Sequence, residues 1–369
     1  MIINYKINDE NHNVIISDKI KDNIVNQVER VKSDKKILLA YDEKIDQLII
    51  NLIRDELKLI GVKLILVKIS GKKKNKNSKI LFKIIDILIA NQFTKNSIFI
   101  SCGGGVVGDL SNLTASLYLR GMIYFHIPST MTAIIDSCIG GKTAINYKDI
   151  INSVGTYYHP KSVMIFKDII DRLPDREYYA GIPEIIKCGL IKKSNILKNL
   201  IKHRDDIKKR KFKILKQIIS ETLETKIFFF KNDIYEKNLR LNLNFGHTFA
   251  HAMEMATDKS FKKDYLRHGE AVGIGIMCEI FYANGGPSKL LKEVINILES
   301  YNLPTKLLPL NFTLDIIDIQ NKIYEGVFLD KKKINKNPRY ICLKKKNNPQ
   351  IKEIKDLDLL NYTIKYFLN

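Results

Sequence analysis

The spacing of apolar residues changes once along the chain, near residue 173, and this change limits the possible folds most strongly. Before it, short apolar runs typical of buried strands alternate with segments whose apolar residues recur every three or four positions. From residue 175 to residue 301 the helical spacing continues without a clear strand. A chain of 369 residues also exceeds one small core. We therefore expect two domains, an α/β domain over 1–173 and a helical domain over 174–369.

Three strands are predicted in the first domain, at 36–41 (KILLAY), 62–69 (VKLILVKI) and 97–101 (SIFIS). Helices are predicted between them at 45–60 and 78–91, with a lysine- and asparagine-rich loop at 71–77. This alternation indicates a parallel, doubly wound sheet that binds ligands at the carboxyl ends of its strands. In the mixed tail of the second half, a late strand is predicted at 339–343.

Composition argues against several classes of protein. No apolar run reaches the roughly 18–20 residues that span a bilayer, because Lys, Asp and Asn interrupt every candidate. The first residues, MIINYKINDENHN, lack the basic start and apolar stretch of a signal peptide, so we expect a cytoplasmic protein. Without a CxxC pair, the scattered cysteines are interpreted as buried free thiols: Cys102, Cys138, Cys188, Cys278 and Cys342.

The formal net charge of +21 raises the question of a nucleic-acid partner. Lysine, isoleucine and asparagine are abundant along the whole chain, however, and there is no Trp. No basic stretch carries interleaved aromatic residues that could stack on bases. We therefore expect no nucleic-acid partner, although the positive field can attract an anionic substrate.

A glycine-rich turn follows the third predicted strand, in the sequence SCGGGVVGD at 101–109. Glycines between a strand and a helix let backbone N–H groups approach a pyrophosphate, and the helix N-terminus favours negative charge. Asp109 could hydrogen-bond a ribose or an amide group. A turn that merely needs glycine at positive φ remains an open alternative.

The segment DSCIGGKTAIN at 136–146 contains Gly-Gly-Lys-Thr, which is similar to the end of a Walker A loop. The first glycine of that motif is missing, because Asp136 occupies its position. A nucleotide-triphosphatase is therefore not favoured. Lys142 beside two glycines still offers a mobile charge next to accessible N–H groups, which suits an anion.

Potential metal ligands gather in the helical half: Glu184, His247, His251 and His268. His247 and His251 are four residues apart and share one helix face. Two histidines with one carboxylate are a common ligand set for a catalytic Zn²⁺ with an open position. Spacing alone favours His247 and His251 as the ligand pair. The alternative is that each histidine is a hydrogen-bonded core or capping residue.

Taken in order, these motifs resemble the 3-dehydroquinate synthase family. The resemblance covers roughly residues 41–332 through GGGVVGDL, YLRG, Pro-Ser-Thr at 128–130, DSCIGGKT, AGIPEIIK, NFGHTFAHAME and HGEAV. It implies a Rossmann-like NAD-binding domain followed by an all-helical metal-binding domain. The implied reaction converts 3-deoxy-D-arabino-heptulosonate 7-phosphate to 3-dehydroquinate and phosphate, a step of the shikimate pathway of aromatic amino acid biosynthesis.

The resemblance also implies roles for individual residues. Zn²⁺ or Co²⁺ would be held by Glu184, His247 and His268, which overrides the pair chosen from spacing, and His251 would transfer protons. Arg120 would reach the site of a partner subunit, which implies a homodimer. Glu236 matches a further acid/base position. The residues implied to bind the substrate or assist catalysis are Asp136, Lys142, Asn152, Lys187, Lys226, Arg240, Asn244 and one of Lys331 and Lys332.

The NAD contacts implied by the resemblance are Asp42, Lys74, Gly104, Gly105, Val106, Asp109, Ser129 and Thr130. Two departures from the family pattern affect this set. The sequence Gly71-Lys72-Lys73-Lys74 lacks the usual acid after its glycine, and Ile151 replaces a lysine before Asn152. We therefore predict weakened NAD affinity, and a submicromolar dissociation constant of metal-loaded protein for NAD would contradict this.

Three alternatives remain at this point. Another sugar-phosphate cyclase is disfavoured because Lys226, Asn244 and His251 are retained in the substrate pocket. An iron-type alcohol dehydrogenase is disfavoured because a small alcohol needs no cluster of lysines and arginines. A catalytically inactive homologue kept for binding is supported only by the altered NAD segments.

Overall fold

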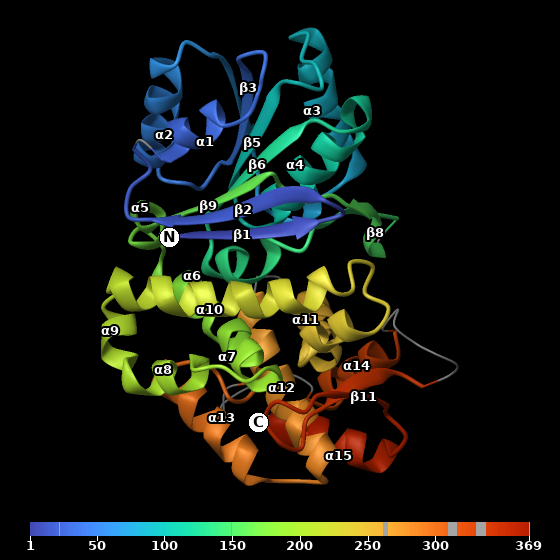
Figure 1. Cartoon of the computed structure of the whole chain (residues 1–369). Helices are drawn as coiled ribbons and strands as arrows, with labels where there is room; N and C mark the ends of the chain where they lie inside the picture. The colour runs from blue at the N-terminus through green and yellow to red at the C-terminus, as the bar shows by residue number, and fades with distance from the viewer. Residues whose placement is uncertain (22, 149, 261–264, 309–315, 330–336, 369) are drawn as a thin grey trace. The chain divides into compact units, whose positions relative to one another are not determined.

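The computed structural model describes residues 1–21, 23–148, 150–260, 265–308, 316–329 and 337–368 (Figure 1). The chain forms two compact units. The first comprises Met1–Tyr178 together with Leu215–Ile227, and the second comprises Tyr179–Ile214 together with Phe228–Asn369. The division into functional domains at residue 173 stays a prediction.

A seven-stranded sheet with the order β1-β2-β9-β6-β5-β3-β4 forms the centre of the first unit. All neighbouring strands are parallel except β1 and β2, which form an antiparallel hairpin. The strands are β1 (Ile2–Ile7), β2 (Glu10–Ser17), β3 (Lys36–Asp42), β4 (Lys63–Ile69), β5 (Ile98–Gly103), β6 (Ile123–Pro128) and β9 (Ser162–Phe166). The three predicted strands are confirmed as β3, β4 and β5.

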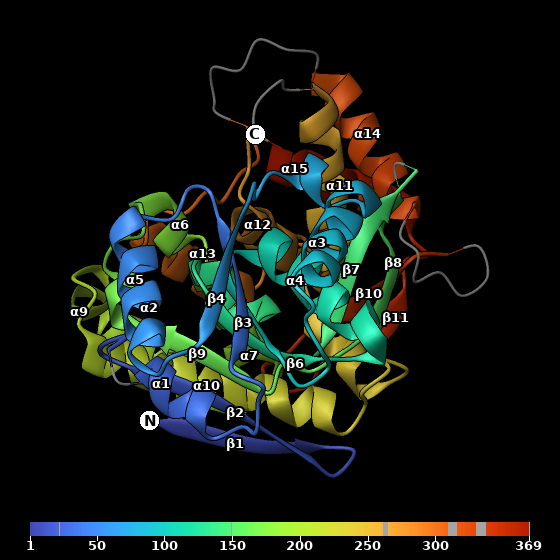
Figure 2. The ribbon, with the colours of Figure 1, turned by 90° about the horizontal axis from the view of Figure 1, so that it is seen from above.

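Helices cover both faces of this sheet, as the predicted doubly wound arrangement requires (Figure 2). Ile37 and Leu39 of β3 belong to a core with α1 (Asn23–Glu29) and α2 (Gln47–Leu59). Leu38, the residue between them, faces a second core with α3 (Ser78–Ala90) and α4 (Gly105–Leu117). Alternate residues of a strand point to opposite faces, so the apolar run of β3 serves both cores.

Side-chain caps fix where the two predicted helices begin. The carboxylate of Asp46 accepts a hydrogen bond of 2.9 Å from the N–H of Leu48 at the start of α2. The amide oxygen of Asn77 accepts one of 3.1 Å from the N–H of Ile80 at the start of α3. Each cap satisfies a backbone donor that the helix itself cannot pair.

Two hairpins in the first unit were not predicted from the sequence. One is β1–β2, where β2 starts with the polar residues Glu-Asn-His-Asn. The other is formed by β7 (Lys142–Tyr147) and β8 (Ile150–Tyr157), directly after the Gly-Gly pair. Most of β8 is exposed, so it lacks the alternation of buried and polar residues that reveals a strand.

Helices dominate the second unit, and β10 (Arg339–Cys342) confirms the late strand predicted at 339–343. It pairs with β11 (Gln350–Glu353), so the described residues of this unit are helical apart from one short hairpin. Its helices include α7 (Ile182–Ile191), α8 (Ile196–Lys202), α9 (Arg204–Lys208), α11 (His247–Ser260), α12 (His268–Asn284), α13 (Lys289–Ser300), α14 (Ile316–Phe328) and α15 (Leu357–Leu368). Residues 215–227 of α10 (Phe212–Lys231) belong to the first unit.

The five cysteines are all buried and form no disulfide, which confirms their interpretation as free thiols. Within the described part of the chain, no helix is both long enough and apolar enough to cross a membrane.

Candidate functional site

The glycine turn of the first unit joins the carboxyl end of β5 to the amino end of α4. A Cβ atom at Gly103 would lie 2.5 Å from Cβ of Val107, and one at Gly104 would lie 3.0 Å from Cγ2 of Thr130. The N–H of Ser129, at the end of β6, donates a hydrogen bond of 3.0 Å to the carbonyl of Gly103. The turn therefore needs glycine for close packing. The helix that follows it, α4, has backbone N–H groups in its first turn that can bind an anion.

The next strand along the edge, β3, ends at Asp42. Its Oδ1 accepts a hydrogen bond of 3.0 Å from the N–H of Lys44. A Cβ atom at Gly71 would overlap the other carboxylate oxygen, so this glycine lets the chain after β4 pass directly over Asp42. Lys74, the predicted NAD contact, lies in a short 3₁₀ turn and its side chain is exposed.

Lys76, two residues after Lys74, was not predicted as a site residue, but its side chain makes the contacts that Lys74 lacks. Its buried side chain forms an ion pair with Asp109 of α4 and donates a hydrogen bond to the amide oxygen of Asn152 in β8. Burial raises the pKa of the Asp109 carboxyl, while the charge and hydrogen bond of Lys76 oppose that rise. Three segments far apart in sequence thus meet at one lysine, immediately before the capping residue Asn77.

A second ion pair in the first unit joins Asp136 and Lys226. Asp136 lies in a π-helical turn, Ala133–Ser137, and Lys226 lies on α10. The ammonium group of Lys226 donates to both the carboxylate and the backbone carbonyl of Asp136. Lys226 is 5% exposed, whereas Lys142 at the start of β7 is exposed to solvent. The pair therefore fixes the ammonium group of Lys226.

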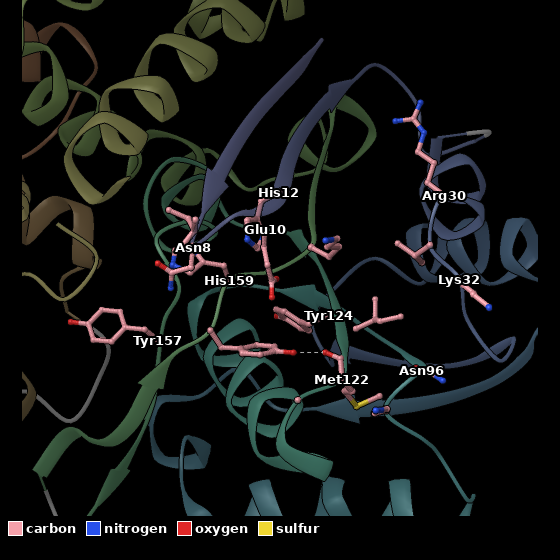
Figure 3. Close-up of a pocket in the computed structure, with 17 residues that line it drawn as sticks. Asn8, Glu10, His12, Arg30, Lys32, Asn96, Met122, Tyr124, Tyr157 and His159 are labelled. Atoms are coloured by element: carbon pink, nitrogen blue, oxygen red, sulfur yellow. Dashed lines mark hydrogen bonds between the residues drawn. The ribbon is translucent and has the colours of Figure 1, made fainter. Parts of the chain in front are cut away.

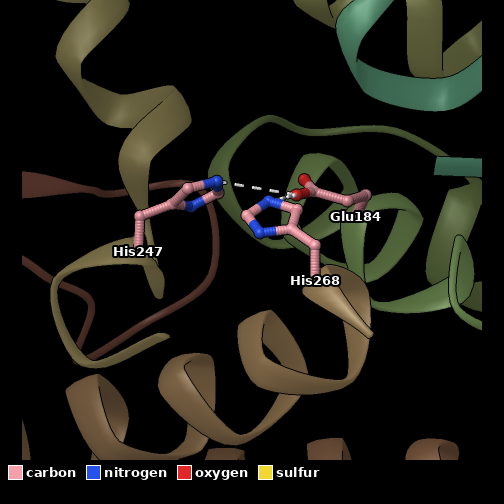
Figure 4. A group of neighbouring side chains, drawn as sticks. All are labelled: Glu184, His247 and His268. Atoms are coloured by element: carbon pink, nitrogen blue, oxygen red, sulfur yellow. Dashed lines mark ion pairs between the residues drawn. The ribbon is translucent and has the colours of Figure 1, made fainter. Parts of the chain in front are cut away.

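In the second unit, three side chains from three helices converge on one point (Figure 4). Glu184 comes from the first turn of α7, His247 begins α11 and His268 begins α12. Nε2 of His247 lies 3.6 Å from Oε1 of Glu184, and Nε2 of His268 lies 3.7 Å from the same oxygen. One atom from each residue lies within 4.8 Å of the other two.

This arrangement fits a divalent metal ion. Glu184 is 1% exposed, and its Oε1 accepts no hydrogen bond from the described residues. Lys187, one turn later and equally buried, pairs with its second oxygen. Two imidazole nitrogens and a carboxylate are the donor set that Zn²⁺ and Co²⁺ bind in open catalytic sites.

His251 is not part of this group. Its ring centroid lies 5.4 Å from that of His247 and 6.2 Å from that of His268, and its side chain is exposed. The pair His247–His251, chosen from spacing alone, is therefore not the one that meets the carboxylate. Glu254, one turn further along α11, was also missed by the sequence analysis; its Oε2 lies 3.0 Å from Nδ1 of His268.

Three further predicted residues, Glu236, Arg240 and Asn244, belong to the segment that connects α10 to α11 in the sequence. The amide of Asn244 donates a hydrogen bond of 2.7 Å to Glu236. The buried guanidinium of Arg240 donates one of 2.7 Å to the carbonyl of Ile234. Burial alone would raise the pKa of Asp233, but three backbone N–H groups, including that of Arg240, lower it. Lys331 and Lys332 lie outside the described residues.

A cavity of about 600 Å³ in the first unit lies elsewhere (Figure 3). Its lining comes from the amino ends of β5, β6 and β9 and from the β1–β2 turn, including Glu10, His12 and Tyr124. The glycine turn lies at the opposite, carboxyl end of β5. None of the described residues that line this cavity is a predicted site residue.

Comparison with known proteins adds independent findings. The N-terminal model of 3-dehydroquinate synthase matches residues 66–180, and its C-terminal model matches residues 181–333. The 3-dehydroquinate synthase of Campylobacter fetus subsp. fetus is 34% identical over 352 residues, which cover 92% of each chain. That of Dictyoglomus thermophilum is 42% identical over 210 residues, which cover 57% of this chain and 58% of the relative.

Solved structures share the fold over the whole chain. A crystal structure of 2-deoxy-scyllo-inosose synthase, complexed with carbaglucose-6-phosphate, NAD⁺ and Co²⁺, is 22% identical in sequence. The two chains match over 100% of their lengths with a TM-score of 0.82. The arrangement of a parallel sheet followed by a helical part is therefore common to both proteins.

Proposed function

Because the chain belongs to the 3-dehydroquinate synthase family, we propose that it is a carbon–oxygen lyase that converts 3-deoxy-D-arabino-heptulosonate 7-phosphate to 3-dehydroquinate and phosphate. The observation that carries the proposal is the convergence of Glu184, His247 and His268. We propose that residues 1–173 bind NAD and residues 174–369 hold the metal. The reaction would serve the shikimate pathway in the cytoplasm.

The cofactors suit the residues that would hold them. The metal would be held by Glu184, His247 and His268. NAD would lie along the carboxyl end of the sheet, against the glycine turn, Asp42, Asp109 and the pair Ser129–Thr130. When bound, NAD accepts and returns a hydride, while the metal acts as a Lewis acid on neighbouring substrate oxygens.

Cationic side chains would hold the two anionic ends of the substrate. Lys142, Arg120 and one of Lys331 and Lys332 suit the phosphate, because ammonium and guanidinium groups form short charge-assisted bonds with its oxygens. Lys187, Lys226 and Arg240 suit the carboxylate and hydroxyl groups, with Asp136, Asn152 and Asn244 as further contacts. The ion pair with Asp136 supports this role for Lys226, because it fixes the direction of the ammonium group.

Proton transfer would fall to His251 and Glu236. Elimination of phosphate requires that a proton leave the carbon next to a transient ketone, and an imidazole near neutrality suits this step. His251 is solvent-exposed beside His247, so its protons can exchange with water. Glu236 accepts a hydrogen bond from Asn244, which fixes the orientation of its carboxylate.

A homodimer in which Arg120 crosses to the partner forms part of the proposal. Leu119 and Arg120 have φ angles of 49° and 63°. This left-handed backbone conformation is unfavourable for residues other than glycine. Arg120 and the neighbouring Leu117 and Leu119 are exposed. Strain retained at an exposed arginine that follows two exposed leucines supports a role for this turn in contacting another chain.

Subunit complementation tests that crossing. The variants Arg120→Ala and Lys226→Ala are each expected to lose activity, and mixed dimers of the two should regain it. In a mixed dimer, the Arg120→Ala subunit keeps Lys226 and receives Arg120 from its partner, so random mixing restores about a quarter of the sites. If Arg120 acts within its own subunit, mixing restores nothing.

Phosphate release tests the proposed reaction. Release from 3-deoxy-D-arabino-heptulosonate 7-phosphate should require both NAD and Zn²⁺ or Co²⁺, and His268→Ala and Lys226→Ala should abolish it. Release from a different phosphorylated sugar alone would indicate another cyclase. The likeness to the inosose synthase, at 22% identity, concerns the fold, whereas relatives above 30% identity favour the dehydroquinate reaction.

A further inference from the structure

Glu254 is an acidic residue that the proposed reaction leaves without a role. It lies on α11, two turns after His247 and one turn after His251, so the three residues share one face of the helix. Its Oε2 lies 3.0 Å from Nδ1 of His268, which belongs to a different helix, α12. The side chain of Glu254 is 13% exposed, so solvent screens this contact only in part.

The two ring nitrogens of His268 face two different carboxylates. Nδ1 faces Glu254, and Nε2 lies 3.7 Å from Oε1 of Glu184. A carboxylate accepts a hydrogen bond but cannot donate one, so Nδ1 of His268 carries the proton when it bonds to Glu254. In neutral imidazole the other nitrogen, Nε2, then keeps its lone pair and directs it toward Glu184 and the point of convergence.

His247 is held differently. Its Nδ1 lies 3.3 Å from the backbone carbonyl of Phe245, two residues earlier in the chain. That acceptor is neutral and cannot be removed by changing a side chain. The two histidines of the group therefore differ in what orients them: a backbone carbonyl for His247 and a charged side chain for His268. Only the second can be tested cleanly by substitution.

We propose that Glu254 is a positioning residue that holds His268 in the tautomer and ring orientation needed to bind a divalent metal through Nε2. The inference rests on the metal site of the proposed function. Glu254 itself is not among the three described residues whose donor atoms converge. It acts through His268: its negative charge increases the electron density that the ring offers to the metal, and its hydrogen bond prevents ring rotation.

The test measures metal affinity instead of turnover. Full-length protein, stripped of metal with a chelator, is titrated with Zn²⁺ against a chromophoric competitor and with Co²⁺ by its visible absorption. Glu254→Ala should weaken binding by about 10- to 100-fold. Glu254→Gln should fall between Glu254→Ala and the wild type, because its amide oxygen still accepts from Nδ1 but carries no charge. The matched control is Glu299→Gln, an exposed acid of α13, which should bind like the wild type.

Two further readouts separate positioning from general damage. Unfolding temperatures without metal should agree among the variants, whereas the rise on adding Zn²⁺ should be smaller for Glu254→Ala and Glu254→Gln. The Co²⁺ absorption should change in shape, because the ligand field depends on how His268 is held. If Glu254→Ala fails to fold, the isosteric Glu254→Gln carries the same test.

The possible failures can be told apart. Wild-type protein that binds neither ion would overturn the metal site and this inference with it. A wild type that binds metal, together with a Glu254→Ala variant whose affinity and Co²⁺ spectrum are unchanged, would overturn the role of Glu254 alone.

Discussion

Buried charges are neutralised in different ways in the two units. In the first, Asp109 faces Lys76 and Asp136 faces Lys226, so each carboxylate has one lysine. In the second, one oxygen of Glu184 pairs with Lys187 while the other lies near Nε2 of two histidines. In each pair the lysine balances its carboxylate, and an imidazole in its neutral form adds a lone pair but no charge. The second unit therefore accumulates electron donors that a cation would satisfy.

The ion pairs of the two units also differ in how far their side chains are exposed to solvent. The side chains of Lys76 and Asp109 are 10% and 22% exposed, whereas those of Lys187 and Glu184 are both 1% exposed. Desolvation makes a lone charge more costly the more deeply it is buried. We conclude that the lysine pairs of the first unit resemble a ligand-contacting surface, while Glu184 and Lys187 form a deeply buried pair at the group of three potential metal ligands.

The largest expected effect comes from removing Glu184. Glu184→Ala takes the carboxylate partner from the buried ammonium group of Lys187, and it should lower the unfolding free energy by about 3–5 kcal/mol in metal-free protein. Asp109→Ala, which breaks the more exposed pair, should cost less, about 1–3 kcal/mol. Urea unfolding in the presence of a chelator measures both values. Equal losses of unfolding free energy in the two variants would contradict the expectation that the more deeply buried pair contributes more to stability.

A double variant tests whether an unpaired buried charge causes the loss of stability in Glu184→Ala. Glu184→Met with Lys187→Met replaces the whole buried pair by apolar side chains, so it should recover most of the stability lost in Glu184→Ala. It should not recover Zn²⁺ binding, because an oxygen ligand is missing. A double variant as unstable as Glu184→Ala would mean that charge burial is not the cause of the loss.

The second prediction compares two lysines of the same loop. Lys76→Ala removes the ion pair with Asp109 and the hydrogen bond to Asn152, so NAD affinity should fall by about 10-fold or more. Lys74→Ala changes an exposed side chain and should alter the affinity by less than about twofold. NAD titration by fluorescence or calorimetry, with metal present, measures both. A larger effect at Lys74 would restore the contact inferred from the family resemblance.

The last expected effect depends on pH and concerns a buried histidine behind the glycine turn. Nδ1 of His126 lies 2.7 Å from Oγ of Ser101, whose hydroxyl also meets that of Tyr124 at 2.6 Å. Burial lowers the pKa of His126 from 6.5 to about 4, against the opposing hydrogen bond with Ser101. A histidine with a lowered folded pKa stabilises the protein fully above pH 6.5, and this contribution is lost as the pH falls toward 4.

Between pH 7.5 and pH 5 this group should remove about 2 kcal/mol of unfolding free energy. His126→Gln, which cannot be protonated, should show a shallower pH dependence by that amount. Urea unfolding of the two proteins at both pH values measures the difference. Parallel pH profiles would show that His126 is neutralised by something other than burial.

Much of the fold was predictable because local patterns agree with the structure. The strands β3, β4 and β5 are apolar runs, and the helices between them repeat apolar residues at helical spacing. The β7–β8 hairpin was not predictable, because it follows two glycines and stays largely exposed. Residue chemistry gave four candidate ligands, the family resemblance selected Glu184, His247 and His268 from them, and the structure brings these three together.

The missed residues depend on tertiary contacts. Spacing of i and i+4 shows that His247 and His251 share a face, but it does not show which element that face meets. Glu254 meets His268 across two helices and 14 positions of sequence. Lys76 is one of several lysines in a run without periodicity, and only its place before the capping residue Asn77 distinguishes it.

The most direct test of the proposed reaction uses NAD in an amount well below that of the substrate. Metal-loaded protein is incubated with 3-deoxy-D-arabino-heptulosonate 7-phosphate, and phosphate, 3-dehydroquinate and NADH are measured together. The proposed reaction predicts equal amounts of phosphate and 3-dehydroquinate, many turnovers for each NAD and no accumulation of NADH. NADH that accumulates without phosphate release would contradict it and would indicate a dehydrogenase.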